Sequence, residues 1–454
     1  MVYDLIVIGG GPAGYLGAIR AGEAGLATLL IERRALGGVC LNEGCIPSKT
    51  LLNSAKLYDY ARFSEKYGVT TEGAHLDHGK VVKRKEKVVR TLVVGVKMQL
   101  RQAGVTTIEG AGYIQGKDGQ SFKVNVGDSV YRGKNLLIAT GSEAVIPPIE
   151  GIEVALRDEQ VLTSREIFDL KEVPDSFVVV GGGVVGLEMG SYFNSVGSKV
   201  TVIEMLDHIA GETDRDISNI LMKNYEKKGV EFLLSSRVMA IDKGKLIYEK
   251  DGETFELEAD KVLMSVGRRP SIQEIGLENI GVQVDDGAIV VDEHGRTNIP
   301  KVYAAGDVNG YSMLAHTAYR EAEVCINNIL GNDDRISYDT ISSVIYTNPE
   351  VAMVGETEKS ATEKGIEYDM VKLPMQYSGR YVAENERGDG ICKILVEKKS
   401  KGLIGVHMIG SYVSEIIYGA ATMMEAGMGI DDIKKIVFPH PTVSEILREG
   451  IFRI

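Results

Sequence analysis

Two of the four cysteines lie close together in residues 37–49, Gly-Gly-Val-Cys-Leu-Asn-Glu-Gly-Cys-Ile-Pro-Ser-Lys. In a regular helix, residues five apart are separated by about 7.5 Å along the axis and point about 140° apart, which is beyond the usual reach of a disulfide. Gly44 relaxes the backbone between Cys40 and Cys45, and Pro47 cannot donate an amide hydrogen to the preceding turn. We therefore expect a distorted helix and a strained, reducible pair.

Other interpretations of this pair stay open from the residues alone. Cys40 and Cys45 could be two buried free cysteines, or half of a metal site without the usual Cys-x2-Cys spacing. Cys325 and Cys392 are isolated, and four cysteines in 454 residues do not make a disulfide framework. In a reducing compartment this favours a catalytic pair over a structural one. We predict no metal site.

A candidate acid-base group lies near the end of the chain, in His440-Pro-Thr-Val-Ser-Glu445. A carboxylate five residues after a histidine, across a proline that fixes the backbone, can orient the imidazole and raise its basicity. The alternative is a bystander histidine before a helix that Ser444 and Glu445 initiate. The pair has a catalytic role only if there is a thiol site on which it can act.

The length and composition indicate a multidomain cytoplasmic protein. At 454 residues and 44% hydrophobic content, we expect about three domains. There is no apolar run of about twenty residues and no basic leader before the first strand, so we expect neither a membrane span nor a signal peptide. The net charge of −13 disfavours nucleic acid and anionic membranes as partners. The basic residues between Lys80 and Ala103 are interpreted as the solvated face of an amphipathic helix.

The chain begins with a pattern typical of dinucleotide binding. A short apolar strand from Tyr3 leads into Gly9-x-Gly11-x-x-Gly14, followed by a helix to about Ala24 and a second strand that ends at Glu32. The glycines permit a tight turn and close approach of a pyrophosphate to the helix N-terminus, and the carboxylate can accept hydrogen bonds from ribose hydroxyls. The sequence therefore predicts a βαβ nucleotide site here.

The same pattern recurs from Phe177, with Gly181, Gly183 and Gly186 before a strand that ends at Glu204. The spacing from first glycine to acidic residue is identical in the two copies, which implies two nucleotide sites. No arginine lies close to Glu204, whose carboxylate suits a free 2′-hydroxyl and repels a 2′-phosphate. NAD is therefore favoured over NADP.

We predict an α/β fold of two Rossmann-like domains followed by an α+β domain. The expected segments are a first domain with the cysteine pair, a second nucleotide domain, a return to the first domain, and a C-terminal domain, with bounds 1–147, 148–270, 271–338 and 339–454. In the third segment, Asp307 follows a strand with a small-residue end and can hydrogen-bond a sugar or ribityl hydroxyl, unless it is only a surface turn residue.

Taken together, these motifs resemble the pyridine nucleotide-disulfide oxidoreductases, and within them the dihydrolipoamide dehydrogenases, along essentially the whole chain. Residues 38–49 resemble the redox motif of that family, residues 440–445 its C-terminal acid-base motif, and Asn348-Pro-Glu-Val is similar to a further family segment. The resemblance implies an FAD-dependent, NAD-linked oxidoreductase, with Cys40, Cys45, His440 and Glu445 as catalytic residues. It also implies a homodimer in which His440 serves the partner's disulfide.

The resemblance also implies the cofactor residues. For FAD they are Gly9, Gly11, Gly14, Glu32, Lys49, Gly112, Thr140, Gly141, Ser142, Asp307, Met313, Leu314, Ala315 and His316. For NAD they are Gly181, Gly183, Gly186, Glu188, Glu204, Gly267 and, least securely, Val238. Lys49 would hold the flavin N5 region, with Glu188 as a possible partner.

The expected activity is oxidation of a dihydrolipoyl group on a carrier protein of a 2-oxo acid dehydrogenase or glycine cleavage system. The carrier is expected in trans, because no lipoyl-like domain precedes the first strand. Phe438, where many such dehydrogenases have another histidine, and the nine residues after Glu445 leave substrate recognition open. Alternatives are a reductase of a low-molecular-weight disulfide, a transhydrogenase, which the cysteine pair disfavours, and a non-enzymatic FAD/NAD redox sensor or scaffold subunit, which the His440 and Glu445 pair disfavours.

Overall fold

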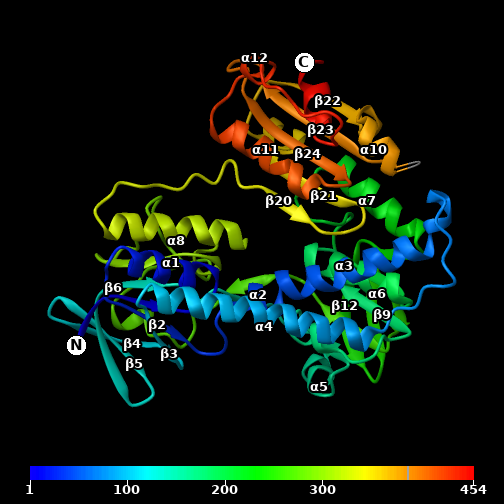
Figure 1. Cartoon of the computed structure of the whole chain (residues 1–454). Coiled ribbons are helices and arrows are strands. Elements are labelled where there is room, and N and C mark those ends of the chain that lie inside the picture. The colour runs from blue at the N-terminus through cyan, green and yellow to red at the C-terminus, as the bar shows by residue number, and fades with distance from the viewer. Residues whose placement is uncertain (386–387) are drawn as a thin grey trace.

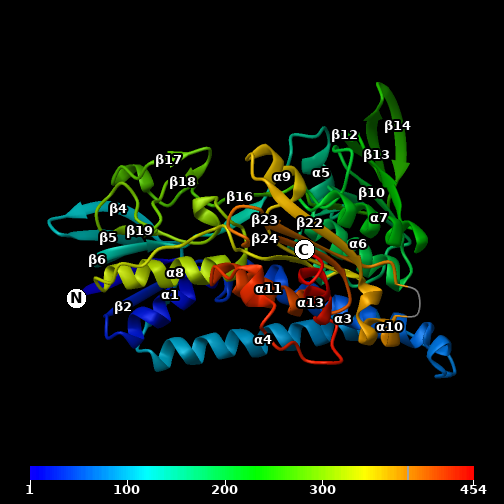
Figure 2. The same cartoon turned by 90° about the horizontal axis from the view of Figure 1, so that it is seen from above.

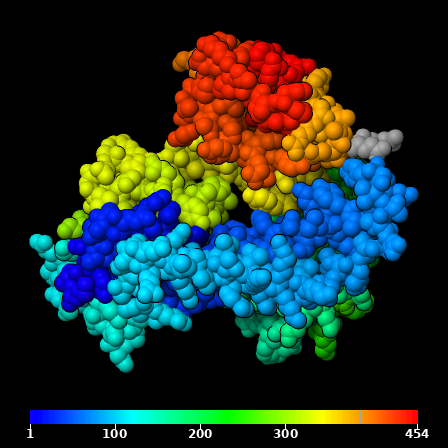
Figure 3. Space-filling model, in the orientation of Figure 1, coloured from blue at the N-terminus to red at the C-terminus, as the bar shows by residue number. Residues whose placement is uncertain are grey.

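The computed structural model describes residues 1–385 and 388–454 and has three parts (Figure 1). The first and second α/β folds form the lower left and lower right of the view, and the C-terminal sheet stands above them. The space-filling view shows the same arrangement, with the C-terminal part rising over the two lower lobes (Figure 3). The predicted fold class is thus confirmed, whereas the exact segment boundaries stay predictions.

The first fold is built on a seven-stranded sheet with the order β3-β2-β1-β6-β5-β4, in which β19 also pairs with β6. Alternate residues of β1 serve opposite faces: Leu5 packs with α1 and α8, and Ile6 packs with the β4–β5 side. Because β19 follows the second fold in sequence, its pairing brings the chain back to the first sheet. The elements are β1 (Val2–Ile8), α1 (Pro12–Glu23), β2 (Thr28–Glu32), β3 (Thr106–Glu109), β4 (Tyr113–Asp118), β5 (Ser121–Val126), β6 (Ser129–Ile138), β7 (Ser142–Ala144), η3 (Leu277–Asn279), β17 (Val284–Asp285), β18 (Ala288–Ile289), β19 (Val302–Ala304), η4 (Asp307–Asn309) and α8 (Ala315–Ile329).

The second fold has a parallel five-stranded sheet with the order β11-β10-β9-β15-β8. Its central strand, β9, is an apolar Phe-Val-Val-Val run that is buried on both faces, as expected for a parallel sheet covered by helices. A three-stranded antiparallel sheet, β12-β13-β14, projects from this fold (Figure 2). The elements are α5 (Ile152–Arg157), β8 (Val161–Leu162), η2 (Glu166–Asp169), β9 (Ser176–Val180), α6 (Val184–Val196), β10 (Lys199–Ile203), α7 (Arg215–Lys227), β11 (Glu231–Leu233), β12 (Ser236–Asp242), β13 (Lys245–Lys250), β14 (Glu253–Glu258), β15 (Lys261–Met264) and β16 (Arg268–Pro270).

The C-terminal part is an antiparallel sheet with the order β20-β21-β24-β23-β22. Its core includes apolar residues of α11 and α13 packed with those of β21, β23 and β24. The elements are β20 (Ser343–Ile345), β21 (Glu350–Gly355), α9 (Glu358–Glu363), β22 (Tyr368–Pro374), η5 (Met375–Tyr377), α10 (Gly379–Glu384), β23 (Ile391–Glu397), β24 (Leu403–Gly410), α11 (Val413–Glu425), α12 (Ile430–Ile433) and α13 (Glu445–Ile451).

Helices between β2 and β3 connect the two α/β folds. Leu51 and Leu52 of α3 are buried in the core of the second fold with Tyr192 and Phe193 of α6. This packing fixes α3, and therefore the residues at its N-terminus, between the two folds. The helices are α2 (Gly38–Glu43), α3 (Cys45–Arg62), η1 (Ser64–Tyr67) and α4 (His78–Gln102), the last of which matches the predicted amphipathic helix.

A buried ionic cluster fixes the second fold to the C-terminal sheet. Lys393 of β23 has a side chain 1% exposed, and its Nζ atom lies 2.9 Å from an oxygen of Asp214, 2.7 Å from Asp216 and 2.5 Å from Glu358. Removal of one partner from such a buried pair leaves an uncompensated charge. The cluster therefore couples the packing of the two parts.

Among the residues described, no helix is both long and apolar enough to cross a membrane.

Candidate active site

The first glycine turn has the geometry of a phosphate-binding turn. Gly9 directly follows β1 and has φ +105°, and Gly11 is the N-cap residue of α1. A Cβ atom on Gly14 would lie 1.8 Å from the carbonyl oxygen of Gly9, so only glycine allows α1 to approach the strand this closely. The Oε2 atom of Glu32 accepts a hydrogen bond from the backbone N–H of Gly10 at 2.6 Å, which holds the carboxylate beside the turn.

The second turn repeats this geometry. Gly181 has φ +101°, and a Cβ on Gly186 would lie 2.3 Å from the carbonyl oxygen of Gly181. Glu204 accepts a hydrogen bond from Gly182 at 2.6 Å, the same distance as in the first turn. Gly267, between β15 and β16, has φ +122°. Both predicted turns therefore form with their acidic residues in place.

A single cavity of about 820 Å³ joins the first glycine turn to the cysteine pair. Its volume is in the range of cofactor pockets, and its wall at the turn includes glycine residues next to the N-terminus of α1. Of the residues predicted to hold FAD, Gly14 is absent from the lining because it serves the packing of α1 on β1. The cavity is lined by Gly9, Gly11, Glu32, Lys49, Gly112, Thr140, Gly141, Ser142, Asp307, Met313, Leu314, Ala315 and His316.

Cys40 and Cys45 lie at this cavity on two different helices. The break that the sequence predicts occurs at Gly44, which has φ −150° and ψ −109° and separates α2 from α3. Pro47 lies in the first turn of α3, where a missing N–H costs no intrahelical hydrogen bond. The break brings the two thiols within hydrogen-bond contact of each other.

The two thiols differ in acidity. A hydrogen bond with Cys40 and the nearby Lys49 cation lower the pKa of Cys45, against the effect of burial. The same hydrogen bond, together with burial, raises the pKa of Cys40. Cys45 is therefore the thiol that ionises first, and Cys40 is its hydrogen-bond donor.

Lys49 is held one turn after Cys45 by a buried carboxylate. Its Nζ donates to Oε1 and Oε2 of Glu188 at 3.0 and 2.9 Å, and it lies 4.5 Å from the ring centroid of Tyr346. Glu188 is 2% exposed and also accepts from the backbone N–H of Tyr346 at 3.0 Å. The structure thus places Glu188, predicted mainly as an NAD residue, at the lysine of the cysteine site.

Asp307, another lining residue of the cavity, is held by residues of two strands, Ser142 of β7 and Arg268 of β16. The hydroxyl of Ser142 donates to Oδ2 of Asp307 at 2.5 Å, and Nε of Arg268 donates to the same hydroxyl at 2.7 Å. Arg268 and Tyr346 are lining residues that the sequence analysis missed. For Arg268 a signal was present, since it directly follows Gly267. For Tyr346 no local motif exists, because it reaches the cavity only through the packing of the C-terminal part.

The predicted acid-base pair forms in a different place. Nδ1 of His440 lies 2.7 Å from Oε1 of Glu445, and the other carboxylate oxygen accepts from the N–H of Thr442 at 3.0 Å. The imidazole is 76% exposed and is not among the residues that line the cavity of its own chain. The pair is formed, but the chain does not bring it to its own cysteines.

Three other residues from the sequence analysis have buried side chains. Val238 is 8% exposed in the apolar core of the second fold, so its contact with a nucleotide stays a prediction. Burial raises the pKa of Cys325 and of Cys392, so their thiolates are suppressed at neutral pH.

Comparison with known families agrees with this geometry. The profile described as "Pyridine nucleotide-disulphide oxidoreductase" matches residues 3–322, and that of the family's dimerisation domain matches residues 341–451. The chain belongs to the pyridine nucleotide-disulphide oxidoreductase family. It is thus a flavoprotein disulfide reductase of a family that uses FAD and NAD(P), as the resemblance implied, and the matched dimerisation domain supports a homodimer.

Similar members of this family cover nearly the whole chain. The mitochondrial dihydrolipoyl dehydrogenase of Dictyostelium discoideum is 38% identical over 98% of this chain and 93% of its own length. Among solved structures, LpdA from Mycobacterium tuberculosis has a TM-score of 0.89 at 26% identity, covering 99% of each chain. The HOCl-induced flavoprotein disulfide reductase RclA from Escherichia coli has a TM-score of 0.86 at 28% identity, also covering 99% of each chain.

Proposed function

We propose that this disulfide reductase is a dihydrolipoyl dehydrogenase that oxidises dihydrolipoyl groups and reduces NAD. The observation that carries the proposal is the combination of an acidic Cys45 thiol beside Cys40 with an exposed His440–Glu445 pair. A dithiol substrate must lose a proton before it can attack a disulfide, and the imidazole is the group that can take it. The 38% identity to a dihydrolipoyl dehydrogenase along the whole chain supports the same activity.

The residues that line the cavity suit FAD: Gly9 and Gly11 would bind the pyrophosphate, Glu32 a ribose and Asp307 the ribityl chain. Lys49, held by Glu188, would contact the flavin ring near N5. When bound, FAD supplies a two-electron carrier between the cysteine pair and the nicotinamide.

The protein's own groups account for the thiol chemistry. In the oxidised enzyme, Cys40 and Cys45 form a disulfide. His440 of the partner subunit takes a proton from one thiol of the substrate, and the resulting thiolate attacks the sulfur of Cys40. Cys45 leaves as a thiolate, which Lys49 stabilises.

The second step completes the exchange. The remaining substrate thiol displaces Cys40 from the mixed disulfide and gives its proton to the departing Cys40 sulfur. The products are a cyclic lipoyl disulfide and the reduced pair, so two electrons and two protons leave the substrate. Glu445 keeps the imidazole oriented, because its carboxylate accepts a hydrogen bond from Nδ1. The other ring nitrogen, Nε2, is then the atom that accepts and releases the proton.

We propose NAD as the acceptor and a lipoyl-bearing protein as the natural substrate. Glu204 lies at the second glycine turn, where its carboxylate suits a free 2′-hydroxyl. The carrier would belong to a 2-oxo acid dehydrogenase or a glycine cleavage system, as the family resemblance implies.

The test is a steady-state assay of the purified protein with free dihydrolipoamide and NAD. We expect NADH formation that Cys45→Ser abolishes and Cys325→Ser does not, since the buried Cys325 lies away from the cavity. NADH-dependent reduction of glutathione disulfide or a related small disulfide, with no turnover of dihydrolipoamide, would instead favour a low-molecular-weight disulfide reductase. The description of RclA as a flavoprotein disulfide reductase is the reason to test disulfides other than lipoamide. A protein that binds FAD but turns over neither substrate would point to the redox-sensor alternative.

A further inference from the structure

A buried carboxyl group behind the Asp307 turn has no part in the chemistry described above. Glu321 lies in α8 and is 3% exposed. Burial raises the pKa of this carboxyl, while hydrogen bonds from Tyr338, Asn309 and Gly306 act against the rise. Because three donors surround it, the carboxyl acts as an acceptor for groups that come from different segments.

One of these donors belongs to the cavity wall. The backbone N–H of Gly306 donates to Oε2 of Glu321 at 2.5 Å, and Gly306 and Asp307 both line the cavity. Gly306 has φ +81°, so the turn has a conformation that few residues other than glycine adopt. Glu321 therefore holds the turn from behind while Ser142 holds Asp307 from the front.

The other main donor comes from the segment that leads into the C-terminal sheet. The hydroxyl of Tyr338 donates to Oε1 of Glu321 at 2.6 Å, and its ring stacks on that of Tyr311 with centroids 5.1 Å apart. Tyr338 lies between the end of α8 and the start of β20. The two oxygens of one carboxylate thus join this connecting segment to the Asp307 turn.

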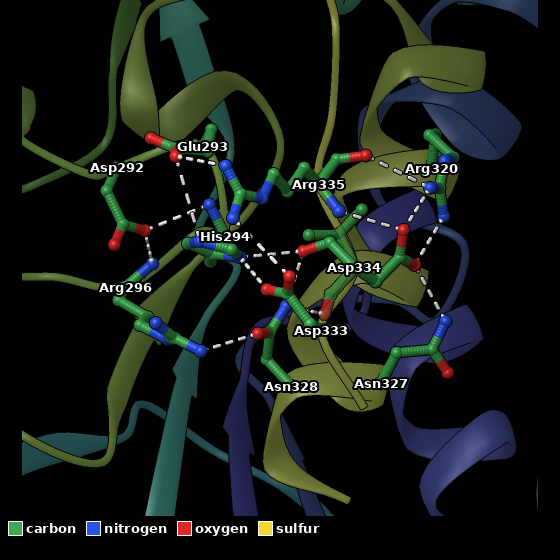
Figure 4. Close-up of polar contacts among 11 residues, drawn as sticks. Asp292, Glu293, His294, Arg296, Arg320, Asn327, Asn328, Asp333, Asp334 and Arg335 are labelled. Atoms are coloured by element: carbon green, nitrogen blue, oxygen red, sulfur yellow. Dashed lines mark hydrogen bonds and ion pairs between the residues drawn. The ribbon is translucent and has the colours of Figure 1, made fainter. Parts of the chain in front are cut away.

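The same segment is anchored a few residues earlier by a network of ion pairs and hydrogen bonds (Figure 4). Arg320, next to Glu321 in α8, donates through both terminal nitrogens to Asp334 at 2.9 and 2.5 Å, which lowers the pKa of Asp334 to about 2. Asn327 donates to Asp334 at 2.7 Å, and the buried His294 contacts the carbonyl oxygen of Asp334 at 2.8 Å. With this anchor, the hydroxyl of Tyr338 has a defined position relative to α8.

We infer that Glu321 is a positioning residue for flavin binding. The Tyr338 hydroxyl fixes the carboxylate of Glu321, and this carboxylate in turn fixes the position of the Gly306–Asp307 turn. This inference rests on the proposed role of Asp307 at the flavin. Loss of the Tyr338 hydroxyl leaves one oxygen of a buried carboxylate without its donor, and the carboxylate relaxes away from the turn. The flavin would then be held less firmly although the fold is intact.

The experiment compares two phenol-to-phenyl substitutions on stacked rings. Tyr338→Phe removes the hydroxyl that reaches Glu321, whereas Tyr311→Phe removes a hydroxyl that donates to the carbonyl of Val291 at 3.3 Å. The release of FAD from each holoenzyme is followed by flavin fluorescence after dilution, and the bound flavin by visible circular dichroism. We expect Tyr338→Phe to release FAD about tenfold faster and to change the visible dichroism, and Tyr311→Phe to match the wild type.

A second pair of variants separates positioning from folding. Glu321→Gln keeps an oxygen that can accept from Gly306, so it should retain FAD better than Glu321→Ala. The midpoint of thermal unfolding, measured by far-UV circular dichroism, should be equal in Tyr338→Phe and Tyr311→Phe. Equal FAD release in these two variants, or loss of FAD in strict parallel with thermal stability, would overturn the inference. A wild-type protein that holds no FAD would overturn the proposed function as well.

Discussion

Cys40 and Cys45 have opposite shifts of acidity although they share one hydrogen bond. The Cys40 thiol and the Lys49 cation both stabilise a Cys45 thiolate, whereas Cys40 is disfavoured as an anion by burial and by that neighbour. This asymmetry predicts which sulfur faces the flavin and which faces the substrate.

We predict that Cys40→Ser shows a long-wavelength charge-transfer absorbance of oxidised flavin at neutral pH and that Cys45→Ser lacks it. The serine hydroxyl can still donate to the Cys45 thiolate. Because the pKa of Cys45 is lowered to about 7, a substantial fraction of the thiol is ionised at neutral pH, and the band should bleach as the pH falls below that value. Visible spectra recorded during an acid titration test this. The opposite pattern in the two variants would reverse the roles of the cysteines.

Glu204 should determine the choice of nicotinamide cofactor. Its carboxylate is fixed by the N–H groups of Gly182 and Leu206 at 2.6 and 2.8 Å, so it cannot easily turn away from a 2′-phosphate. Like charges placed together cost several kcal/mol, so we expect kcat/KM for NAD to exceed that for NADP by about 100-fold or more.

The matched variants are Glu204→Gln and Glu231→Gln, and each removes one negative charge. Glu204 directly follows β10, and Glu231 lies in β11, which pairs with β10 in parallel. The first should narrow the NAD preference, and the second, away from the glycine turn, should leave it unchanged. If both variants reduced the ratio of kcat/KM for NAD to that for NADP equally, the overall negative charge of the domain, and not the position of Glu204, would set the cofactor preference.

At the scale of elements, the two βαβ turns depend on glycines that permit close packing of helix on strand. A methyl group at Gly186 would lie 2.3 Å from the carbonyl oxygen of Gly181 and 2.6 Å from the hydroxyl of Ser265, whereas one at Gly190 in the same helix has its nearest neighbour at 3.6 Å. The same helix therefore contains a forbidden and a permitted site for alanine.

We predict that Gly186→Ala raises the KM for NAD at least about tenfold while FAD stays bound, because the displaced α6 no longer presents its N-terminus to the pyrophosphate. Gly190→Ala should keep the KM and gain about 0.5–1 kcal/mol of stability from the better helix former. Steady-state kinetics, the FAD-to-protein absorbance ratio and thermal unfolding test both. An unchanged KM in Gly186→Ala would show that the second turn does not bind the nucleotide.

The elements that the sequence predicts well are those with strong local signals. Both glycine turns, the strands that end at Glu32 and Glu204 and the break at Gly44 follow from short motifs whose geometry is local. The contacts of Arg268, Tyr346 and Glu321 depend on segments more than 100 residues apart or on a turn behind the cavity, which no spacing rule encodes. Val238 is assigned to NAD only by the family resemblance, whereas its apolar side chain is 8% exposed in the core of the second fold.

At the scale of the whole molecule, the site is divided between parts that one chain does not bring together. The cysteine pair lies at a cavity between the two α/β folds, and His440 is exposed in the C-terminal part, which matches the family's dimerisation domain. An imidazole that must take a proton from a thiol cannot act from the surface of its own subunit. A second subunit that presents its His440 to the cavity would solve this problem.

We predict that two inactive variants restore activity when they form mixed dimers. Cys45→Ser and His440→Gln chains are unfolded together and refolded with FAD, so that random pairing makes about half of the dimers mixed. In a mixed dimer, the intact disulfide of the His440→Gln chain meets the intact His440 of the Cys45→Ser chain at one of two sites. About a quarter of the wild-type activity should therefore return.

The control is each variant refolded alone, with FAD content and dimer formation measured by absorbance and gel filtration. If His440 acted within its own subunit, every mixed dimer would contain one chain without Cys45 and one chain without His440, and no site would be complete. Mixed dimers that carry FAD but show no activity would thus place His440 at the cysteines of its own chain. A rearrangement of the C-terminal part would then be required, because the exposed imidazole lies outside the cavity in the present structure.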